Sequence, residues 1–293
     1  MDESRQAAHR APADRPACAR LARDSRRLAV EPAYERLLAT HGLDALDALF
    51  ETEGTQRFTK PGLPGWRERI RLELFDADGR PHTFYLKRYT APPVGAQLRR
   101  VLSGPLTHGT AWVEWTRMRE LASCGIGTAE PVAFGEETTW VWERRSAVLT
   151  AQTPGESLER WVAGHPTRAP RRVLDALARF VARLHEQGFV HRDLYLSHVF
   201  IDQADPQAPA FRLIDLQRVF RPRWRRTRWL VKDLAALNYS TPRSVASSTD
   251  RLRWLQVYLG VPKLRGRDRR FARRIMAKTH RIARHDRRTV NAR

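Results

Sequence analysis

The chain has 293 residues, 42% of them hydrophobic, and a formal net charge of +21. This length allows one large domain or two lobes with a sizeable core. There is no apolar run of about 18 residues, so we expect no membrane-spanning helix, and without an uninterrupted apolar stretch near the N-terminus we expect no secretory signal. Only Cys18 and Cys124 are present, which predicts no disulfide framework and no cysteine metal site and fits a reducing cytosol.

The positive charge is concentrated near the C-terminus. Residues 221–293 hold 22 Lys and Arg against 4 Asp and Glu, which is +18 of the total. Such a block attracts anions, whether nucleic acid, anionic lipid head groups, or an acidic or phosphorylated sugar. An Arg-rich set of solvated helix faces is the alternative. Nucleic acid is disfavoured because no nucleic-acid-binding motif accompanies the charge.

The N-terminal half is predicted to be rich in strands. Residues 1–30 mix seven Arg with Pro, Ala and four acidic residues, which predicts a disordered basic lead-in. Leucines at helical spacing predict helix within residues 31–50. Residues 50–89 then alternate apolar and charged positions around an Ala-Asp-Gly turn, which predicts a hairpin whose last strand carries Lys87.

The pattern changes from strand to helix near the middle of the chain. A connection rich in Pro and Gly, residues 91–109, leads to a predicted helix over residues 110–123 and then to further strands. Beyond Gly155 helical patterns dominate, and residues 171–188 form a long amphipathic helix that ends at a glycine. We therefore expect an α+β chain with a boundary between two lobes near residues 152–156.

The stretch HRDLYLSHVF, His191 to Phe200, carries the first chemical signal. Protein-kinase-like enzymes use H-R-D-L-x-x-x-N to place a carboxylate and a metal ligand, and the first four letters are intact here. Asp193 would accept the proton of an acceptor hydroxyl during phosphoryl transfer. Its alternative role is to cap the turn that follows. The amphipathic helix before it and a second motif after it favour catalysis.

The second signal is Asp215, which ends an apolar run 22 residues after Asp193, with room for one hairpin between them. Asp215-Leu216-Gln217 stands where kinases have D-F-G. A carboxylate that leaves a buried strand is costly unless it is paired or binds a metal, and Mg²⁺ on nucleotide phosphates supplies such a partner. A turn residue after the hairpin is the alternative.

Two histidines differ in their predicted roles. His198 replaces the Asn of the kinase pattern, and its nitrogen suits Mg²⁺ less well than oxygen does. Four roles stay open for His198: a water-mediated metal contact, a bond to a phosphate oxygen, orientation of Asp193, or a satisfied buried histidine. His191 is predicted to be structural and to hold the loop.

Lys87 lies on the predicted third strand, on the face opposite Phe84 and Leu86. In kinases a lysine on this strand holds the α- and β-phosphates and pairs with a helix Glu. Glu114 lies inside the apolar arc of the helix over residues 110–123, whereas Glu120 points away, so Glu114 is the predicted partner. The neighbouring Arg88 is the competing cation.

The glycine-rich loop is the weakest part of the match. No G-x-G-x-x-G precedes the first strand pair, and no Walker A pattern occurs, which argues against a P-loop enzyme. The corresponding region offers Gly54, Gly62 and Gly65, with Arg57 and Lys60 as candidate phosphate-side cations, and the sequence does not assign them further.

Together these residues resemble the lipopolysaccharide kinase family, bacterial kinase-like enzymes that phosphorylate inner-core heptose or Kdo sugars. The resemblance covers roughly residues 50–285 and rests on FYLKRY, AWVEWTRMRELASCGIGTAEPVAFGE, FVARLHEQGFVHRDLYLSHVF, RLIDLQRV and VKDLAALNYS. The combination of HRDLYxxH with DLQR is specific, because ordinary protein kinases and aminoglycoside kinases have Asn or another residue where His198 stands.

The resemblance implies a bilobal protein-kinase-like α+β fold that uses ATP and Mg²⁺. The antiparallel-sheet small lobe, residues 31–153, would bind the nucleotide, and the mainly helical large lobe, residues 154–293, would carry the catalytic loop. The acceptor would be a sugar hydroxyl on a lipid-linked glycan at the inner face of the cytoplasmic membrane. The implied site residues are Lys87 and Glu114 at the phosphates, Asp193 as base, Asp215 as metal ligand, and Asp233 as a brace of the catalytic loop, His191 to His198. His198 is itself a candidate catalytic residue and metal ligand, with its role open as stated above.

The basic C-terminal region then gains a candidate purpose. Residues 221–232, RPRWRRTRWLVK, interleave Arg and Trp, which predicts peripheral contact with an anionic membrane surface. Two other functions stay open: a kinase for a protein or small metabolite, and a non-catalytic pseudokinase that binds membranes through this region. The intact set of catalytic residue types counts against the pseudokinase. The sequence predicts no oligomeric state.

Overall fold

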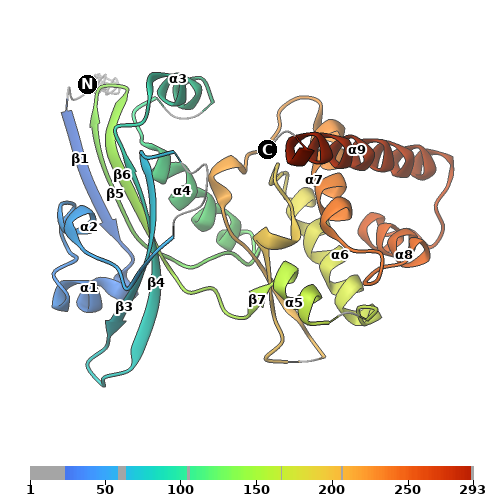
Figure 1. Cartoon of the computed structure of the whole chain (residues 1–293), viewed down its shortest axis with the longest axis horizontal. Helices are drawn as coiled ribbons and strands as arrows, with labels where there is room; N and C mark the ends of the chain where they lie inside the picture. Colours follow the sequence, from blue (N-terminus) through green and yellow to red (C-terminus); the bar gives the residue numbers. More distant parts are fainter. Residues whose placement is uncertain (1–23, 59–63, 104–105, 166, 206, 292–293) are drawn as a thin grey trace, which may run out of the picture.

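The computed structural model describes residues 24–58, 64–103, 106–165, 167–205 and 207–291. They fold into two lobes, one built on a twisted sheet at the left of Figure 1 and one mainly helical at the right. The α+β bilobal fold expected from the sequence is therefore confirmed.

The small lobe is built on a six-stranded sheet in the order β1-β5-β6-β4-β3-β2, and every neighbouring pair is antiparallel. Its strands are β1 (Asp24–Val30), β2 (Gln56–Arg57), β3 (Arg67–Phe75), β4 (Pro81–Thr90), β5 (Pro131–Thr139) and β6 (Trp142–Ala151).

Side chains along β3 and β4 point alternately to the two faces of the sheet, and these faces differ in what covers them. Apolar side chains such as Ile70 and Leu86 are buried under the short helices α1 (Glu35–Thr40) and α2 (Ala48–Glu51). The opposite face, which carries Lys87, is covered by α4 (Thr110–Ser123), in agreement with the helix expected over residues 110–123. The two-residue period of the strands thus directs Lys87 toward the helix that carries Glu114.

One correction concerns the N-terminal lead-in. Residues 24–30, expected to be disordered, form β1 and pair with β5 along their whole length. Edge-strand pairing relies on backbone hydrogen bonds and does not require an apolar face, so the Arg-rich composition concealed the strand. Residues 1–23 of the predicted lead-in lie outside the described residues.

A second correction concerns the connection over residues 91–109. It contains the helix α3 (Val94–Ser103). The buried Gln97 holds α3 to the sheet, because its Nε2 donates a hydrogen bond of 2.7 Å to the carbonyl oxygen of Glu143. This anchor is a long-range contact that local composition does not reveal.

The large lobe combines a small sheet with five helices among the described residues. The sheet has the order β7-β8-β9, with β7 (Glu156–Ser157), β8 (Val199–Asp202) and β9 (Ala210–Leu213). The helices are α5 (Leu158–Gly164), α6 (Arg171–Glu186), α7 (Arg226–Ser240), α8 (Ser248–Leu259) and α9 (Gly266–Asn291), and α9 lies along α7 in Figure 1. Short 3₁₀ turns occur at η1 (Pro32–Tyr34), η2 (Leu196–His198) and η3 (Leu216–Arg218).

Helix α6 supports the predicted catalytic loop that follows it. Val173, Leu177, Val181 and Leu184 form the expected apolar stripe and are all buried. Burying each such side chain stabilises the fold by roughly 1.5–3 kcal/mol, which fixes the start of the loop. Among the described residues, no helix combines the length and the apolar character needed to cross a membrane.

Candidate active site

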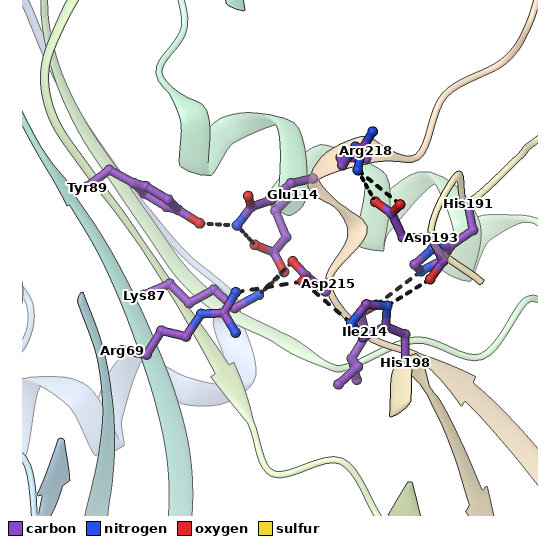
Figure 2. Close-up of polar contacts among 11 residues, drawn as sticks. Arg69, Lys87, Tyr89, Glu114, His191, Asp193, His198, Ile214, Asp215 and Arg218 are labelled. Atoms are coloured by element: carbon purple, nitrogen blue, oxygen red, sulfur yellow. Dashed lines mark hydrogen bonds and ion pairs between the residues drawn. The ribbon is translucent and has the colours of Figure 1, made fainter. Parts of the chain in front are cut away.

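The predicted site residues converge where the small lobe faces the large lobe (Figure 2). β3, β4 and α4 contribute from one side, and the catalytic loop, the end of β9 and η3 contribute from the other. The β8–β9 hairpin returns the chain beside the catalytic loop, where the Ile214 nitrogen donates to the His198 carbonyl oxygen at 3.1 Å. The spacing of one hairpin between Asp193 and Asp215 therefore brings them to the same cleft.

Lys87 and Glu114 form the predicted ion pair. Lys87 Nζ lies 2.5 Å from Glu114 Oε1, and the two side chains are only 15% and 3% exposed. Glu120 instead faces outward and pairs with Arg117. A buried carboxylate requires a cation, and Lys87 meets that requirement while its remaining donors face the cleft.

Gln217 completes the environment of Glu114 from the large lobe. Its Nε2 donates to Glu114 Oε2 at 3.2 Å and also contacts the hydroxyl of Tyr89. Arg117 Nε of α4 donates to the Val219 carbonyl oxygen at 3.2 Å just beyond η3. Helix α4 is thus attached to the segment that follows Asp215.

Asp215 lies among three basic side chains. Its carboxylate oxygens are 3.6 Å from Lys87 Nζ, 3.7 Å from Arg69 Nη2 and 3.9 Å from His198 Nε2. Burial acts to raise the pKa of Asp215, but Lys87, Arg69 and His198 outweigh it and lower the pKa from 3.8 to about 2. Asp215 is therefore ionised at neutral pH, as a metal ligand must be.

Both loop motifs contain a residue with left-handed backbone conformation. The φ angles of Arg192 and Asp215 are +71° and +60°. For residues other than glycine this conformation costs on the order of 1 kcal/mol and persists only where surrounding contacts enforce it. Here it turns each chain segment so that Asp193 and Asp215 reach the cleft.

Asp193 is held by cations on the large-lobe side. Arg218 Nη1 donates to Asp193 Oδ1 at 2.9 Å and forms an ion pair with Oδ2 at 2.7 Å, and Lys232 Nζ lies 3.7 Å from Oδ1. Burial lowers the pKa of Lys232, with Asp193 opposing that change. The Asp193 carboxylate is thereby oriented, and because the Arg218 side chain is half exposed, that side chain has room to move.

Asp233 braces the catalytic loop as expected. It is fully buried, and its two oxygens accept from the backbone nitrogens of His191 at 2.6 Å and of Arg192 at 2.7 Å. His185 Nε2 lies 3.3 Å from the same carboxylate. Because hydrogen bonds from buried donors to a charged group contribute about 1.5–3 kcal/mol each, helix α7 fixes the loop firmly.

The histidines of the loop take different positions. His191 is buried, its Nε2 lies 3.1 Å from the Ile214 carbonyl oxygen, and burial lowers its pKa, which agrees with a structural role. His198 is not a satisfied buried residue, because its side chain is 26% exposed. Its Nδ1 donates to the Asp193 carbonyl oxygen at 2.8 Å, and this leaves Nε2 directed toward Asp215.

The donor set around Asp215 fits a Mg²⁺ ion that is completed by a nucleotide. Among the described residues no group of three or more His, Cys, Asp or Glu could hold a metal by itself. Mg²⁺ commonly takes one or two protein ligands and adds water and substrate phosphates. The ionised Asp215 and the Nε2 of His198 lie 3.9 Å apart, about twice a metal–ligand distance, and could flank one ion.

Four residues of this site were missed at the level of sequence: Arg69, Gln217, Arg218 and Lys232. Gln217 and Arg218 lie in the quoted DLQR motif, and Lys232 precedes Asp233, so position in a motif could have drawn attention to them. Of the glycine-loop candidates, Arg57 pairs with Glu68 at 2.9 Å, whereas Lys60 and Gly62 lie outside the described residues.

Comparison with known proteins gives consistent matches over most of the chain. Residues 71–258 match the family model described as Lipopolysaccharide kinase (Kdo/WaaP) family. The lipopolysaccharide core heptose(I) kinase WaaP of Pseudomonas aeruginosa is 30% identical over 245 residues, which cover 80% of this chain and 87% of that protein. The protein of the same description from Escherichia coli is 29% identical over 205 residues, 67% of this chain and 76% of that protein.

A solved structure agrees with these matches. A structure of WaaP in complex with acyl carrier protein is similar, with a TM-score of 0.65 and 26% sequence identity. The similarity covers 88% of this chain and 98% of that one.

Proposed function

The chain belongs to the lipopolysaccharide kinase (Kdo/WaaP) family, and on this premise we propose that it transfers the γ-phosphoryl group of ATP to a heptose hydroxyl of the lipopolysaccharide inner core. Membership of the family makes it a phosphotransferase with a hydroxyl of an inner-core sugar as acceptor; ATP and the heptose are the proposal. Heptose is favoured over Kdo because the relatives from P. aeruginosa and E. coli are both heptose(I) kinases.

The convergence of Lys87 and Glu114 from the small lobe with Asp193 and Asp215 from the large lobe carries this proposal. Lys87 would hold the donor phosphates while Glu114 fixes the direction of its ammonium group. Asp193 would accept the proton of the sugar hydroxyl, and Arg218 and Lys232 would keep that carboxylate oriented. Mg²⁺, held by Asp215 and His198, would supply positive charge that neutralises the phosphate oxygens.

The two lobes divide these tasks. We assign nucleotide binding to the small lobe, extended by β1 to residues 24–153, and acceptor binding with proton removal to residues 154–291. The sheet of the small lobe ends at Ala151 and the second sheet begins at Glu156, which supports a boundary between them. The alternatives of a protein kinase, a metabolite kinase or a non-catalytic module are disfavoured by the family membership.

A peripheral membrane contact is proposed for the segment between η3 and α7. Arg221, Arg223, Trp224 and Arg225 are all exposed there, and Trp224 is 82% exposed. An exposed Trp among cations suits the interface of an anionic membrane. Arg221 lies only three residues after Arg218 of the site, so the contact would place the cleft near a lipid-linked acceptor at the inner face of the cytoplasmic membrane.

Acyl carrier protein is proposed as a partner. The support is the complex formed by the similar WaaP and an apolar cavity of about 340 Å³ among the helices of the large lobe. Trp161, Leu177, Leu234 and Leu255 are among its lining residues, which suit an acyl chain and not a nucleotide. Binding of acylated carrier protein in preference to the unacylated form would support this, and equal affinity for both would contradict a role for the cavity.

A direct assay tests the kinase proposal. Inner-core lipopolysaccharide from a deletion strain is incubated with the purified protein, ATP and Mg²⁺, and mass spectrometry locates any added phosphate. We expect one phosphate on heptose, and we expect Asp193→Asn to lower kcat by about 10²-fold or more. Asp44→Asn, at an exposed position of the small lobe, is the control. Phosphate found on Kdo would contradict heptose as the acceptor. Full turnover in Asp193→Asn would contradict Asp193 as the base.

A further inference from the structure

Arg69 occupies a special position in the small-lobe sheet. It is the third residue of β3 and lies directly opposite Lys87 of β4 in the antiparallel register. Directly opposed residues project to the same face of a sheet, about 5 Å apart. Arg69 and Lys87 therefore form a cross-strand pair of cations on the face that looks into the cleft, and Figure 2 shows both side chains reaching toward Asp215.

The neighbouring arginines of β3 are engaged elsewhere. Arg67 stacks on the ring of Trp66, with its Cζ 4.3 Å from the ring centroid. Arg71 donates to Glu73 at 3.0 Å. Among the described residues, the ion-pair partner found for Arg69 is Asp215, at 3.7 Å, which is too long for a direct hydrogen bond. Among the residues that the structure describes, no side-chain hydrogen bond engages the guanidinium group of Arg69, so its donors remain available to a ligand.

The sequence does not contain the glycine motif with which kinases usually hold phosphates. No G-x-G-x-x-G occurs ahead of β3, so the sequence does not predict a loop of that pattern whose backbone nitrogens would bind the phosphates. A planar guanidinium binds phosphate oxygens in a bidentate manner and can supply equivalent donors from a side chain. The guanidinium of Arg69 lies beside Lys87, which is the residue proposed above to hold the donor phosphates.

We propose that Arg69 binds the β- and γ-phosphates of the donor nucleotide, as a second cation beside Lys87. This inference rests on the proposed ATP-dependent function and adds a specific ligand group to it. Arg69 then contacts substrate directly, and its cross-strand register with Lys87 sets the spacing of the two cations.

Nucleotide affinity across a phosphate series tests the proposal. ATP, ADP and AMP are titrated by calorimetry into wild type, Arg69→Gln, Arg69→Lys and Arg71→Gln. We expect Arg69→Gln to bind ATP and ADP roughly ten- to a hundredfold more weakly and AMP nearly unchanged. Arg69→Lys should bind ATP and ADP with intermediate affinity, because lysine keeps the positive charge but cannot make the bidentate contact of a guanidinium. Arg71→Gln, two residues along the same face and equally exposed at 34%, should match wild type.

A rival role for Arg69 is only to balance the charge of Asp215. The comparison is therefore repeated without Mg²⁺ in an Asp215→Asn background, where that role disappears. If Arg69→Gln still weakens the binding of ATP and ADP in this background, phosphate binding by Arg69 is supported. If the affinity no longer changes, the proposal is overturned. An equal loss of affinity for AMP would also overturn the proposal, because AMP has neither a β- nor a γ-phosphate. Thermal denaturation confirms that each variant is folded. If the wild-type protein binds no adenine nucleotide, the proposed use of ATP is wrong. If wild type binds ATP and Arg69→Gln binds it equally well, only the role of Arg69 is wrong.

Discussion

Gln217 Nε2 donates a hydrogen bond to Glu114 Oε2 across the cleft at 3.2 Å, while Lys87 holds the other oxygen of the same carboxylate. Gln217 stands two residues after Asp215, where D-F-G kinases have glycine. The position of helix α4 is therefore linked to the backbone that carries the candidate metal ligand.

Gln217→Leu should uncouple this link. The volume is nearly kept, but Glu114 loses one donor, so we expect about a tenfold fall in kcat/KM with ATP as the varied substrate. Tyr89→Phe is the matched variant, because it removes the hydroxyl next to Gln217 and leaves Glu114 bonded. A Tyr89→Phe effect as large as that of Gln217→Leu would show that the bond to Glu114 is not the decisive one.

Lys87→Met should cost stability as well as activity. It leaves Glu114 buried without its cation, and breaking a buried ion pair from one side costs about 3–5 kcal/mol. The double variant Lys87→Met with Glu114→Gln removes the uncompensated charge, so it should regain much of the free energy of unfolding and none of the activity. Urea denaturation measures the first quantity and the phosphotransfer assay the second. If the double variant is no more stable than Lys87→Met, the buried charge of Glu114 is not what destabilises the single variant.

Asp215 should make the metal-free protein sensitive to acid. Its pKa is lowered from 3.8 to about 2 in the folded state, so its stabilising contribution is complete above about pH 4 and is lost as the pH falls toward 2. We expect the difference in unfolding free energy between wild type and Asp215→Asn to shrink by on the order of 2 kcal/mol across that window. Parallel pH profiles for the two proteins would contradict the lowered pKa.

Membrane contact should depend on charge and on Trp224. Sedimentation with anionic vesicles should deplete the protein from solution, whereas neutral vesicles should not, and about 0.5 M salt should weaken the binding. Trp224→Ser should reduce anionic binding because an interfacial aromatic side chain is lost. Trp142→Ser, at an exposed tryptophan of the small-lobe sheet, is the control. Equal sedimentation with neutral and anionic vesicles would argue against the proposed surface.

Local patterns were sufficient to predict several parts of the site. The helical period placed Glu114 on the buried face of α4 and Glu120 on the exposed face, and the structure agrees. The strand period placed Lys87 opposite the apolar side chains of β4. Both periods are properties of a short segment, so they can be read without knowing what that segment packs against. The same is true of the spacing between Asp193 and Asp215, which a single hairpin fills.

Pairing between distant segments could not be predicted in this way. β1 was hidden because its partner, β5, lies about a hundred residues further along the chain. Arg69 shares its alternating pattern with Arg67 and Arg71, and only the register with β4 and the approach of Asp215 distinguish it from them. The sequence by itself thus determined the bilobal fold and singled out Lys87, Asp193 and Asp215 as candidates for its chemistry. The tertiary structure alone decided which further side chains meet them, because such contacts depend on strand register and on the docking of the two lobes.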